Sequence, residues 1–359
     1  MLIRKIFESL SIIIKHKLFL NLSSVVNLIK FLTLPRKEIV QYKPLQISCY
    51  ITDKCTLKCN FCPHHSLYRN EKYPFLHNSL PDMSFETFKK IVNAFPEVIR
   101  ITLAGVGEPF LNKDIFKMID YAISKKKLIT IISNGTLLKK YLNELLKRKI
   151  FSLCVSLNVE SQTEFYRLTN NKEYDFNNIV SALQEFLKKN KKQIKLDLTY
   201  VVSKRNVFNI DKVLNFVKEK LPDVSKVMFH NVIYFGIEQK YPLKETLCDD
   251  DLEVVNYIEQ IRKQMNNYPF KIVLPQLKRI KSGIFCDDFF TQLHIDAEGN
   301  VSGCGRSITP QKEFGNIFQE GRDVWNNDFF QKMRVMSIKK EFNQHPVCKN
   351  CMGSRLKFI

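Results

Sequence analysis

The sequence predicts an α/β fold, in which a mainly parallel sheet of consecutive βα units is followed by a small cysteine-rich C-terminal region. Two observations lead to this class. Between residue 45 and about residue 232, short β-rich runs alternate with apolar stripes at helical spacing, which is typical of strands and helices that alternate around a parallel sheet. Beyond residue 285 the helical pattern fades, and four of the ten cysteines lie there. A chain of 359 residues is long enough for two or three domains.

The pattern of apolar residues defines six strands and the helices between them. Ser84 is typical of an N-cap, and it precedes Phe85, Phe88 and Ile91 at helical spacing. Comparable stripes run over 115–122, 138–145, 179–186 and 210–217. The expected strands are 45–52, 98–104, 128–133, 151–158, 194–202 and 225–232.

The remainder of the chain has fewer regular signals. We expect a helix near 249–266 and a second one over 324–336. Between these two helices, the turn residues from Asp296 to Asn300 separate Gln292 and its neighbours from Val301, which predicts a β-hairpin.

Residues 1–43 are apolar but interrupted by charges, with eight Lys and Arg against two acidic residues. No run reaches the roughly 18 residues that a membrane-spanning helix needs, and no small-residue cleavage site follows the first apolar run. We expect one or two amphipathic helices, which either lie on an anionic membrane surface or pack against the main domain. Ten cysteines without a secretory signal indicate a reducing, cytoplasmic location.

The net charge of +20 favours contact with something anionic, such as nucleic acid, a membrane surface or an acidic substrate. The lysines are spread through most segments, as solvated helix faces require, and no arginine-rich or glycine-rich tail is present in the sequence. We therefore expect no DNA partner. The alternative of an RNA-modifying or RNA-binding protein is supported by the net charge alone.

Three cysteines follow the first expected strand at the spacing CxxxCxxC: Cys55, Cys59 and Cys62. Three thiolates this close can hold three irons of a 4Fe–4S cubane, whose usual complement is four cysteines. The fourth iron is then open to a substrate or cofactor, which points to catalysis. The alternatives are a zinc site, for which zinc prefers four closed ligands, and chance spacing.

At these residues the chain resembles the radical S-adenosylmethionine (SAM) family, whose signature CxxxCxΦC has an aromatic residue before the last cysteine, here Phe61. The resemblance implies a partial (β/α)6 TIM-like barrel. It also implies that Cys55, Cys59 and Cys62 hold the catalytic SAM-binding cluster, which an electron donor such as flavodoxin or ferredoxin reduces. The SAM sulfonium is then split, and a 5′-deoxyadenosyl radical abstracts hydrogen from a substrate.

Three further motifs follow expected strands and resemble SAM contacts of the family. Gly107, Glu108 and Pro109 match a GGEP-like motif that holds the SAM amino group, at the strand end where barrel enzymes place their chemistry. Ser133 and Asn134 belong to a turn that resembles the family's TNGT segment, although Asn-Gly is also simply a good turn. The remaining expected contacts are Ser156, Asn158 and Arg167. At the position of Asn158 the family more often has Asp.

Period-2 alternation assigns further side chains to the inside of the barrel. If helices cover the outside, Phe151, Leu153, Val155 and Leu157 face them. The inward set comprises Cys154, Ser156, Asn158, Asp197, Thr199, Val201, Met228 and His230. Asp197 and His230 are therefore predicted substrate or SAM contacts, while a lone histidine at a strand end is also commonly structural.

The C-terminal cysteines are Cys286, Cys304, Cys348 and Cys351, which together suffice to close one 4Fe–4S cluster or a structural zinc site. Their arrangement resembles a SPASM or twitch auxiliary domain and implies one auxiliary cluster, fully ligated by protein. Cys49, Cys154 and Cys248 stand apart and are expected to be packing residues or, for Cys154, pocket lining. The predicted regions are a basic amphipathic arm (1–43), the partial barrel (44–232), a connecting region (233–285) and the auxiliary-cluster domain (286–359).

The resemblance specifies the chemistry better than the substrate. We expect an oxidoreductase or maturase in which the auxiliary cluster assists oxidation or cross-linking. Because only 44 residues precede the first expected strand, a small molecule or sugar is favoured over a ribosomal peptide that is recognised by an N-terminal leader-binding domain. An inert iron–sulfur protein that carries electrons is the remaining alternative.

Overall fold

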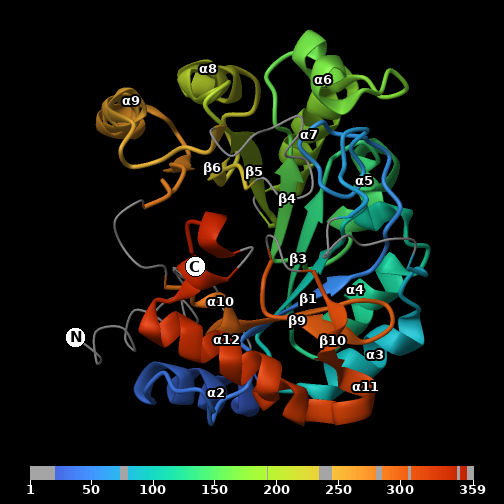
Figure 1. The fold of residues 1–359 in the computed structure, drawn as a ribbon. Helices are drawn as coiled ribbons and strands as arrows, with labels where there is room; N and C mark the ends of the chain where they lie inside the picture. Colours follow the sequence, from blue (N-terminus) through green and yellow to red (C-terminus); the bar gives the residue numbers. More distant parts are fainter. Residues whose placement is uncertain are drawn as a thin grey trace.

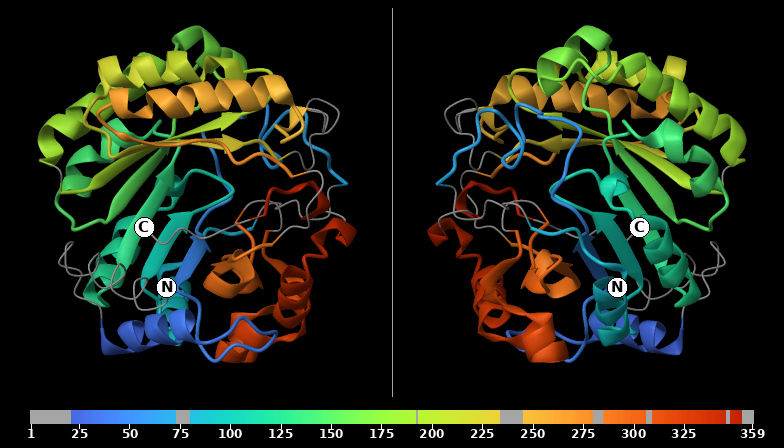
Figure 2. Two further views of the ribbon diagram at one scale, coloured as in Figure 1. Left: turned by 90° about the vertical axis from the view of Figure 1, so that its left-hand side faces the viewer. Right: turned by 90° about the vertical axis from the view of Figure 1, so that its right-hand side faces the viewer.

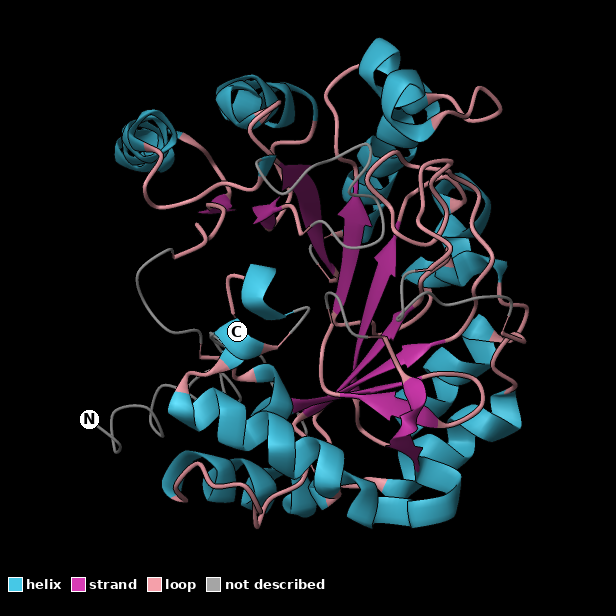
Figure 3. Ribbon diagram, in the orientation of Figure 1, coloured by secondary structure: helices cyan, strands magenta, loops and turns pink. Residues whose placement is uncertain are grey.

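A single curved sheet organises the residues that the structure describes, which are 21–72, 80–191, 193–233, 245–279, 285–305, 309–345 and 348–353 of the computed structural model. Its strand order is β10-β9-β8-β1-β2-β3-β4-β5-β6-β7 (Figures 1 and 3). Pairing is parallel from β8 through β7 and antiparallel at β8–β9 and β9–β10. The strands are β1 Gln46–Tyr50, β2 Arg100–Ala104, β3 Leu128–Ser133, β4 Ser152–Ser156, β5 Lys195–Val202, β6 Lys226–Asn231, β7 Lys271–Val273, β8 Gln292–Ile295, β9 Asn300–Ser302 and β10 Gln311–Asn316.

Helices cover the convex face of the parallel strands, and the C-terminal segments lie on the open side of the arc (Figure 2). Each outer helix buries one apolar stripe against the sheet, as Phe88, Ile91 and Val92 do in α3, because an amphipathic helix is stable only when this stripe leaves water. The helices are α2 Leu22–Thr33, α3 Phe85–Ala94, α4 Ile115–Ser124, α5 Leu138–Leu146, α6 Gln162–Thr169, α7 Phe176–Asn190, α8 Ile210–Lys220, α9 Leu252–Gln264, α10 Asp288–Thr291, α11 Ile317–Glu320 and α12 Asp328–Lys339.

The predicted α/β class and its six strands are confirmed, with boundaries within two residues of β1 to β6. The hairpin around residues 296–300 is also confirmed, as β8 and β9, and the side chain of Asp296 accepts hydrogen bonds from the backbone N–H groups of Glu298 and Asn300. The sequence did not predict that β8 adds to the sheet beside β1, where Gln46 pairs with Gln292. The C-terminal hairpin is therefore hydrogen-bonded directly to the strand that precedes the cysteine triad.

The N-terminal arm is described from residue 21 onward, so the amphipathic helix expected before that point lies outside the described residues. Helix α2 packs against the main domain, with Leu28 and Phe31 buried and the Ser24 hydroxyl donating to the carbonyl of Val98. Among the described helices, none has the length and hydropathy needed to cross a membrane.

A buried arginine joins the arm to the C-terminal region. Arg334 on α12 is fully buried and donates hydrogen bonds to the backbone carbonyls of Glu38, Phe289 and Trp325. Burial lowers its pKa to about 9. Because a buried charge is tolerated only when its donors are satisfied, these bonds fix α12 against α10 and hold the C-terminal region in place.

Candidate active site

The cysteine triad lies in the loop that follows β1, at the carboxyl end of the parallel strands. Two neighbouring segments hold this loop. The backbone N–H groups of Lys58 and Asn60 donate to the carbonyls of Thr169 and Leu168 at the end of α6. On the other side, the Thr56 hydroxyl is hydrogen-bonded to Thr136 over 2.8 Å. The three cysteines thus occupy a loop whose backbone is fixed from two directions.

Close backbone contact joins the triad loop to the loop after β2. The N–H of Glu108 donates to the carbonyl of Lys54 over 2.7 Å. A Cβ atom at Gly107 would lie 2.0 Å from the Lys54 oxygen, and one at Gly105 would lie 2.5 Å from the Thr52 oxygen. Only glycine permits this approach, so the predicted Gly107 motif positions the segment that leads directly into Cys55.

Glu108 is almost fully buried beneath this loop. Its carboxylate accepts hydrogen bonds from the Ser133 hydroxyl, from the backbone N–H of Phe110 and from that of Asn134, at 2.9, 3.2 and 2.7 Å. Burial raises the pKa of Glu108 to about 7, against the opposing effect of these three donors. Glu108 and Ser133, both predicted SAM contacts, therefore bond to each other and shape the turn after β3.

The turn that Glu108 holds presents Asn134 to the triad. The Asn134 side-chain amide donates to the Thr56 hydroxyl over 2.9 Å and lies 3.8 Å from the sulfur of Cys55. Amide donors that contact a ligating sulfur tune an iron–sulfur centre. The motifs after β1, β2 and β3, which are far apart in the sequence, therefore form one connected network at the same edge of the sheet.

Replacing Glu108 by glutamine should remove a pH dependence of stability. The folded-state pKa of Glu108 is about 7, above its ordinary 4.5, so the folded state binds more protons between these values. The contribution of Glu108 is complete below pH 4.5 and is lost as the pH rises through about 7. This loss amounts to about 3 kcal/mol.

Urea unfolding of the reduced, metal-free wild type and the Glu108→Gln variant at pH 5, 6, 7 and 8 measures this contribution. At pH 5 the folded Glu108 is protonated, and its hydroxyl oxygen can still accept a hydrogen bond, whereas the NH2 group of glutamine cannot. The variant should therefore be less stable at pH 5. The difference should shrink as the pH rises. A difference in unfolding free energy that is constant from pH 5 to 8 would contradict the expectation.

The donor set of the triad fits an iron–sulfur cluster. Burial raises the pKa of the Cys59 thiol, and the neighbouring Cys62 and Cys55 raise it further. Soft thiolates are the ligands that iron–sulfur clusters use. Across the described ranges, no three His, Cys, Asp or Glu side chains are arranged to hold a single metal ion, but a cubane separates its ligands more widely because four irons lie between them.

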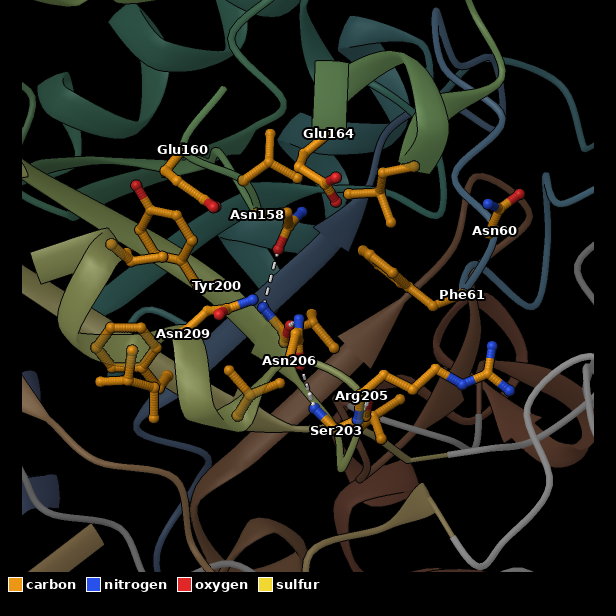
Figure 4. A pocket seen from close by; sticks show the side chains of 18 of the residues that line it. Asn60, Phe61, Asn158, Glu160, Glu164, Tyr200, Ser203, Arg205, Asn206 and Asn209 are labelled. Atoms are coloured by element: carbon orange, nitrogen blue, oxygen red, sulfur yellow. Dashed lines mark hydrogen bonds between the residues drawn. The ribbon is translucent and has the colours of Figure 1, made fainter. Parts of the chain in front are cut away.

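A cavity of about 310 Å³ lies beside the triad loop, at the carboxyl ends of β4, β5 and β6. Phe61 and Asn158 project toward this space (Figure 4). Asn158 has a left-handed backbone with φ of 62°, which asparagine tolerates well, and its side chain accepts from the N–H of Val201 over 2.9 Å. The size is within the roughly 300–1,000 Å³ of ligand pockets.

The loop after β5 also lines this cavity, which the sequence alone did not indicate. Asn206 closes the loop by accepting from the N–H of Ser203 over 2.7 Å (Figure 4). An asparagine three residues after a serine at a strand end is the signal that was available. Arg167, a predicted SAM contact, lines the cavity but is paired with Glu164 at 2.5 Å, and its side chain is 77% exposed.

A larger cavity, of about 640 Å³, occupies the concave side of the sheet. The inward residues of eight strands line it, including the predicted Cys154, Asp197 and Met228. Phe151 was expected to face the helices, but it lines this cavity too. Phe151 precedes the first residue of β4, so the alternation of the strand does not fix its direction.

Other predicted inward residues lie nearer the carboxyl ends of the strands. The Thr199 hydroxyl donates to the Ser156 hydroxyl over 3.1 Å, which links two predicted residues across β4 and β5. His230 lies two positions after Met228 on β6 and so faces the same side of the strand. It is exposed, however, and lines neither described cavity. Asp197 lies in the first half of β5, whereas the cavity beside Phe61 is lined by the second half. Asp197 is thus placed to contact a ligand in the larger cavity.

The C-terminal cysteines gather on the open side of the sheet. Burial raises the pKa of Cys286 well above its usual value, and nearby Asp288, Cys304 and Cys351 raise it further. Burial likewise raises the pKa of Cys348, with added contributions from Cys304 and Cys351. The four thiols therefore influence one another, although the sequence separates them by up to 65 positions. Four thiols are the complement that closes a 4Fe–4S cluster.

His294 connects this thiol group with the larger cavity. It lies on β8, its imidazole is buried, and neither ring nitrogen has a hydrogen-bond partner among the residues that the structure describes. Burial lowers its pKa to about 3, so the ring is neutral. A Cβ atom at Gly305, next to Cys304, would lie 2.8 Å from this ring. A buried polar ring without partners is costly, and a ligand in the cavity would satisfy it.

Comparison with known proteins assigns the chain to a class of enzymes. The model of the radical SAM superfamily matches residues 49–217, and that of an iron–sulfur cluster-binding domain, SPASM, matches residues 286–352. The chain belongs to the radical SAM superfamily and carries a C-terminal SPASM domain. It is therefore an enzyme whose cofactors are SAM and 4Fe–4S clusters, including an auxiliary cluster.

The relatives that match include probable GTP 3′,8-cyclases of Methanococcus maripaludis. The protein of strain C5 is 30% identical over 316 residues, which cover 83% of this chain and 94% of the relative. The protein of strain S2 is 27% identical over 315 residues, which cover 83% of this chain and 95% of the relative. Both alignments span nearly the whole of the relatives.

Two solved structures share the fold. SuiB from Streptococcus suis, bound to precursor peptide SuiA, has a TM-score of 0.62 at 19% identity and covers 91% of this chain and 72% of its own. The enzyme anSMEcpe with bound AdoMet has a TM-score of 0.63 at 19% identity, with 85% of each chain covered. At such identities these likenesses concern the fold alone.

Proposed function

We propose that this protein cleaves SAM at a cluster held by Cys55, Cys59 and Cys62, and then oxidises a small molecule bound in the larger cavity. The observation that carries this proposal is the position of that cavity. It lies on the concave side of the sheet, lined by β1, which leads into the triad loop, and by β8 and Gly305 beside Cys304. A substrate there would border the strand that leads to the triad and the residue that follows Cys304.

The chain's own residues prepare the site in defined ways. Glu108 and Asn134 hold the triad loop at the carboxyl ends of the strands. Phe61 and Asn158 provide an aromatic wall and an amide for SAM in the smaller cavity.

Cys286, Cys304, Cys348 and Cys351 are proposed to hold the auxiliary cluster. When bound, the two clusters would supply single-electron chemistry, one giving the electron that cleaves SAM and the other taking one electron from the substrate. The substrate would lose a hydrogen atom to the nucleoside and one electron to the auxiliary cluster, and its remaining proton would be released to water. His294, with its free ring nitrogens beside Cys304, is placed to hydrogen-bond the substrate during this oxidation.

The relatives support a small-molecule substrate, because the chain spans nearly the full length of proteins named for a reaction of GTP. A peptide substrate is the second candidate. It is supported by SuiB, whose structure contains a precursor peptide and whose fold covers 91% of this chain. The volume of the larger cavity, about 640 Å³, suits a small molecule or a single side chain better than an extended peptide.

Anaerobic reconstitution of the full chain tests this proposal. We expect about eight irons per chain and formation of 5′-deoxyadenosine after reduction in the presence of SAM. About four irons would remove the auxiliary cluster from the proposal. Cluster formation without any 5′-deoxyadenosine would instead indicate an electron carrier, and steeply salt-dependent binding of tRNA would favour an RNA substrate.

A further inference from the structure

Basic side chains gather at the amino-terminal ends of the strands, on the floor of the larger cavity. Arg100, Lys195 and Lys226 are the first residues of β2, β5 and β6, and all three line the cavity. Among the described residues that line it, the charged ones are Arg100, Lys195, Lys226, Lys271, Asp197 and Asp288. Four cations, of which Lys271 is exposed, thus stand against two carboxylates on this side of the sheet.

The described protein groups neutralise these cations only in part. Lys226 lies 3.2 Å from one oxygen of Asp197. The other Asp197 oxygen and the Nε atom of Arg100 are buried, and neither has a hydrogen-bond partner among the described residues. Burial lowers the pKa of Lys195. Asp197 opposes this shift, while the like charges of Arg100, Lys226 and Lys271 lower the pKa further. A bound anion would relieve both the repulsion and the missing hydrogen bonds.

Two of the cations are held ready by one aromatic ring. The guanidinium carbon of Arg100 lies 5.1 Å from the centre of the Phe151 ring, and the Lys195 ammonium lies 4.4 Å from the same centre. Contact with one ring orients both cations without neutralising them. Both side chains line the larger cavity, where a ligand can contact them.

We propose that this cationic floor binds a phosphoryl group of the substrate, with Arg100 and Lys195 as its principal ligands. The inference rests on the proposed function and names its substrate class. An arginine fork with nearby ammonium groups suits the several oxygens and multiple charge of a phosphate better than a single carboxylate. The volume of the cavity, about 640 Å³, suits a small phosphorylated molecule, such as a nucleotide or a sugar phosphate.

The length of the strands limits the shape of this molecule. Arg100 begins β2, and Ala104 ends it just before the loop that packs against the residues leading to Cys55. Four steps along a strand span roughly 13 Å. The reacting C–H bond must approach the triad end, so the phosphoryl group and that bond lie at opposite ends of the substrate.

Calorimetric titration of the anaerobically reconstituted full chain with inorganic pyrophosphate tests this site. We expect the wild type to bind pyrophosphate. The Arg100→Gln and Lys195→Gln variants should each bind it at least tenfold more weakly, because each loses a charge-assisted hydrogen bond. Lys212→Gln, which makes the same charge change on the exposed side of α8, should bind as the wild type does. GTP and glucose 6-phosphate, titrated in parallel, distinguish the two sources of the phosphoryl group.

Thermal unfolding of each variant shows whether it is folded. If Arg100→Gln does not fold, the pyrophosphate affinity of Lys195→Gln tests the site. The inference is overturned if none of the three phosphorylated probes binds at millimolar concentration, if both variants bind as the wild type does, or if citrate binds as tightly as pyrophosphate. Formation of 5′-deoxyadenosine by the wild type is measured separately. Its absence would refute the proposed reaction, while loss of pyrophosphate binding would refute only the phosphoryl site.

Discussion

Replacing Cys59 by alanine should abolish the reductive cleavage of SAM and remove about four of the irons that the reconstituted chain holds. Cys59 is the central cysteine of the triad, and burial together with Cys62 and Cys55 raises the pKa of its thiol. As a free thiol it would stay protonated, so it serves as a ligand only when a metal displaces the proton. Without it the cluster has two protein ligands, and the iron that would meet SAM is not held in place.

Iron content, the electron paramagnetic resonance spectrum of the reduced protein and 5′-deoxyadenosine formation measure this effect. Cys248→Ala is the matched control, because Cys248 is another partly buried cysteine and lies outside both thiol groups. It should retain about eight irons and full SAM cleavage. If Cys59→Ala still forms 5′-deoxyadenosine, the triad is not the site of SAM cleavage.

The motifs that hold the triad could be predicted from sequence because each directly follows a strand. Parallel strands place their carboxyl ends at one edge, so Gly107, Ser133 and Asn158 had to lie near Cys55 once the strands were recognised. The individual hydrogen bonds among these residues could not be predicted from the sequence. The burial of Glu108 depends on the contact between two loops about 55 positions apart in sequence, and local pattern does not encode that contact.

The cationic floor escaped prediction for a different reason. Lysine and arginine at the start of a strand are typical of a solvated end, and the alternation that identified Cys154 and Asp197 was followed only toward the carboxyl ends. Lys195 lies two positions before Asp197, and Lys226 lies two positions before Met228. The same period therefore assigns them inward. That β8 also lines this interior depends on its pairing with β1 across 246 positions, which no local signal shows.

Replacing Cys286 by alanine should separate the two iron–sulfur centres. Cys286 is a proposed ligand of the auxiliary cluster, and its backbone N–H and carbonyl are both hydrogen-bonded to the Ser337 hydroxyl over 2.9 Å. Ser337 is fully buried on α12, so the local backbone keeps its anchor when the thiol is lost. We expect the variant to fold, to lose about four irons and to retain the triad cluster.

The variant should then cleave SAM to 5′-deoxyadenosine yet form no oxidised product, because the substrate has no acceptor for its second electron. Cys59→Ala is the complementary control, since it should keep the auxiliary cluster and lose SAM cleavage. Iron content and 5′-deoxyadenosine distinguish the two variants before any substrate is known. If the Cys286→Ala protein retains about eight irons, Cys286 is not a ligand of the auxiliary cluster.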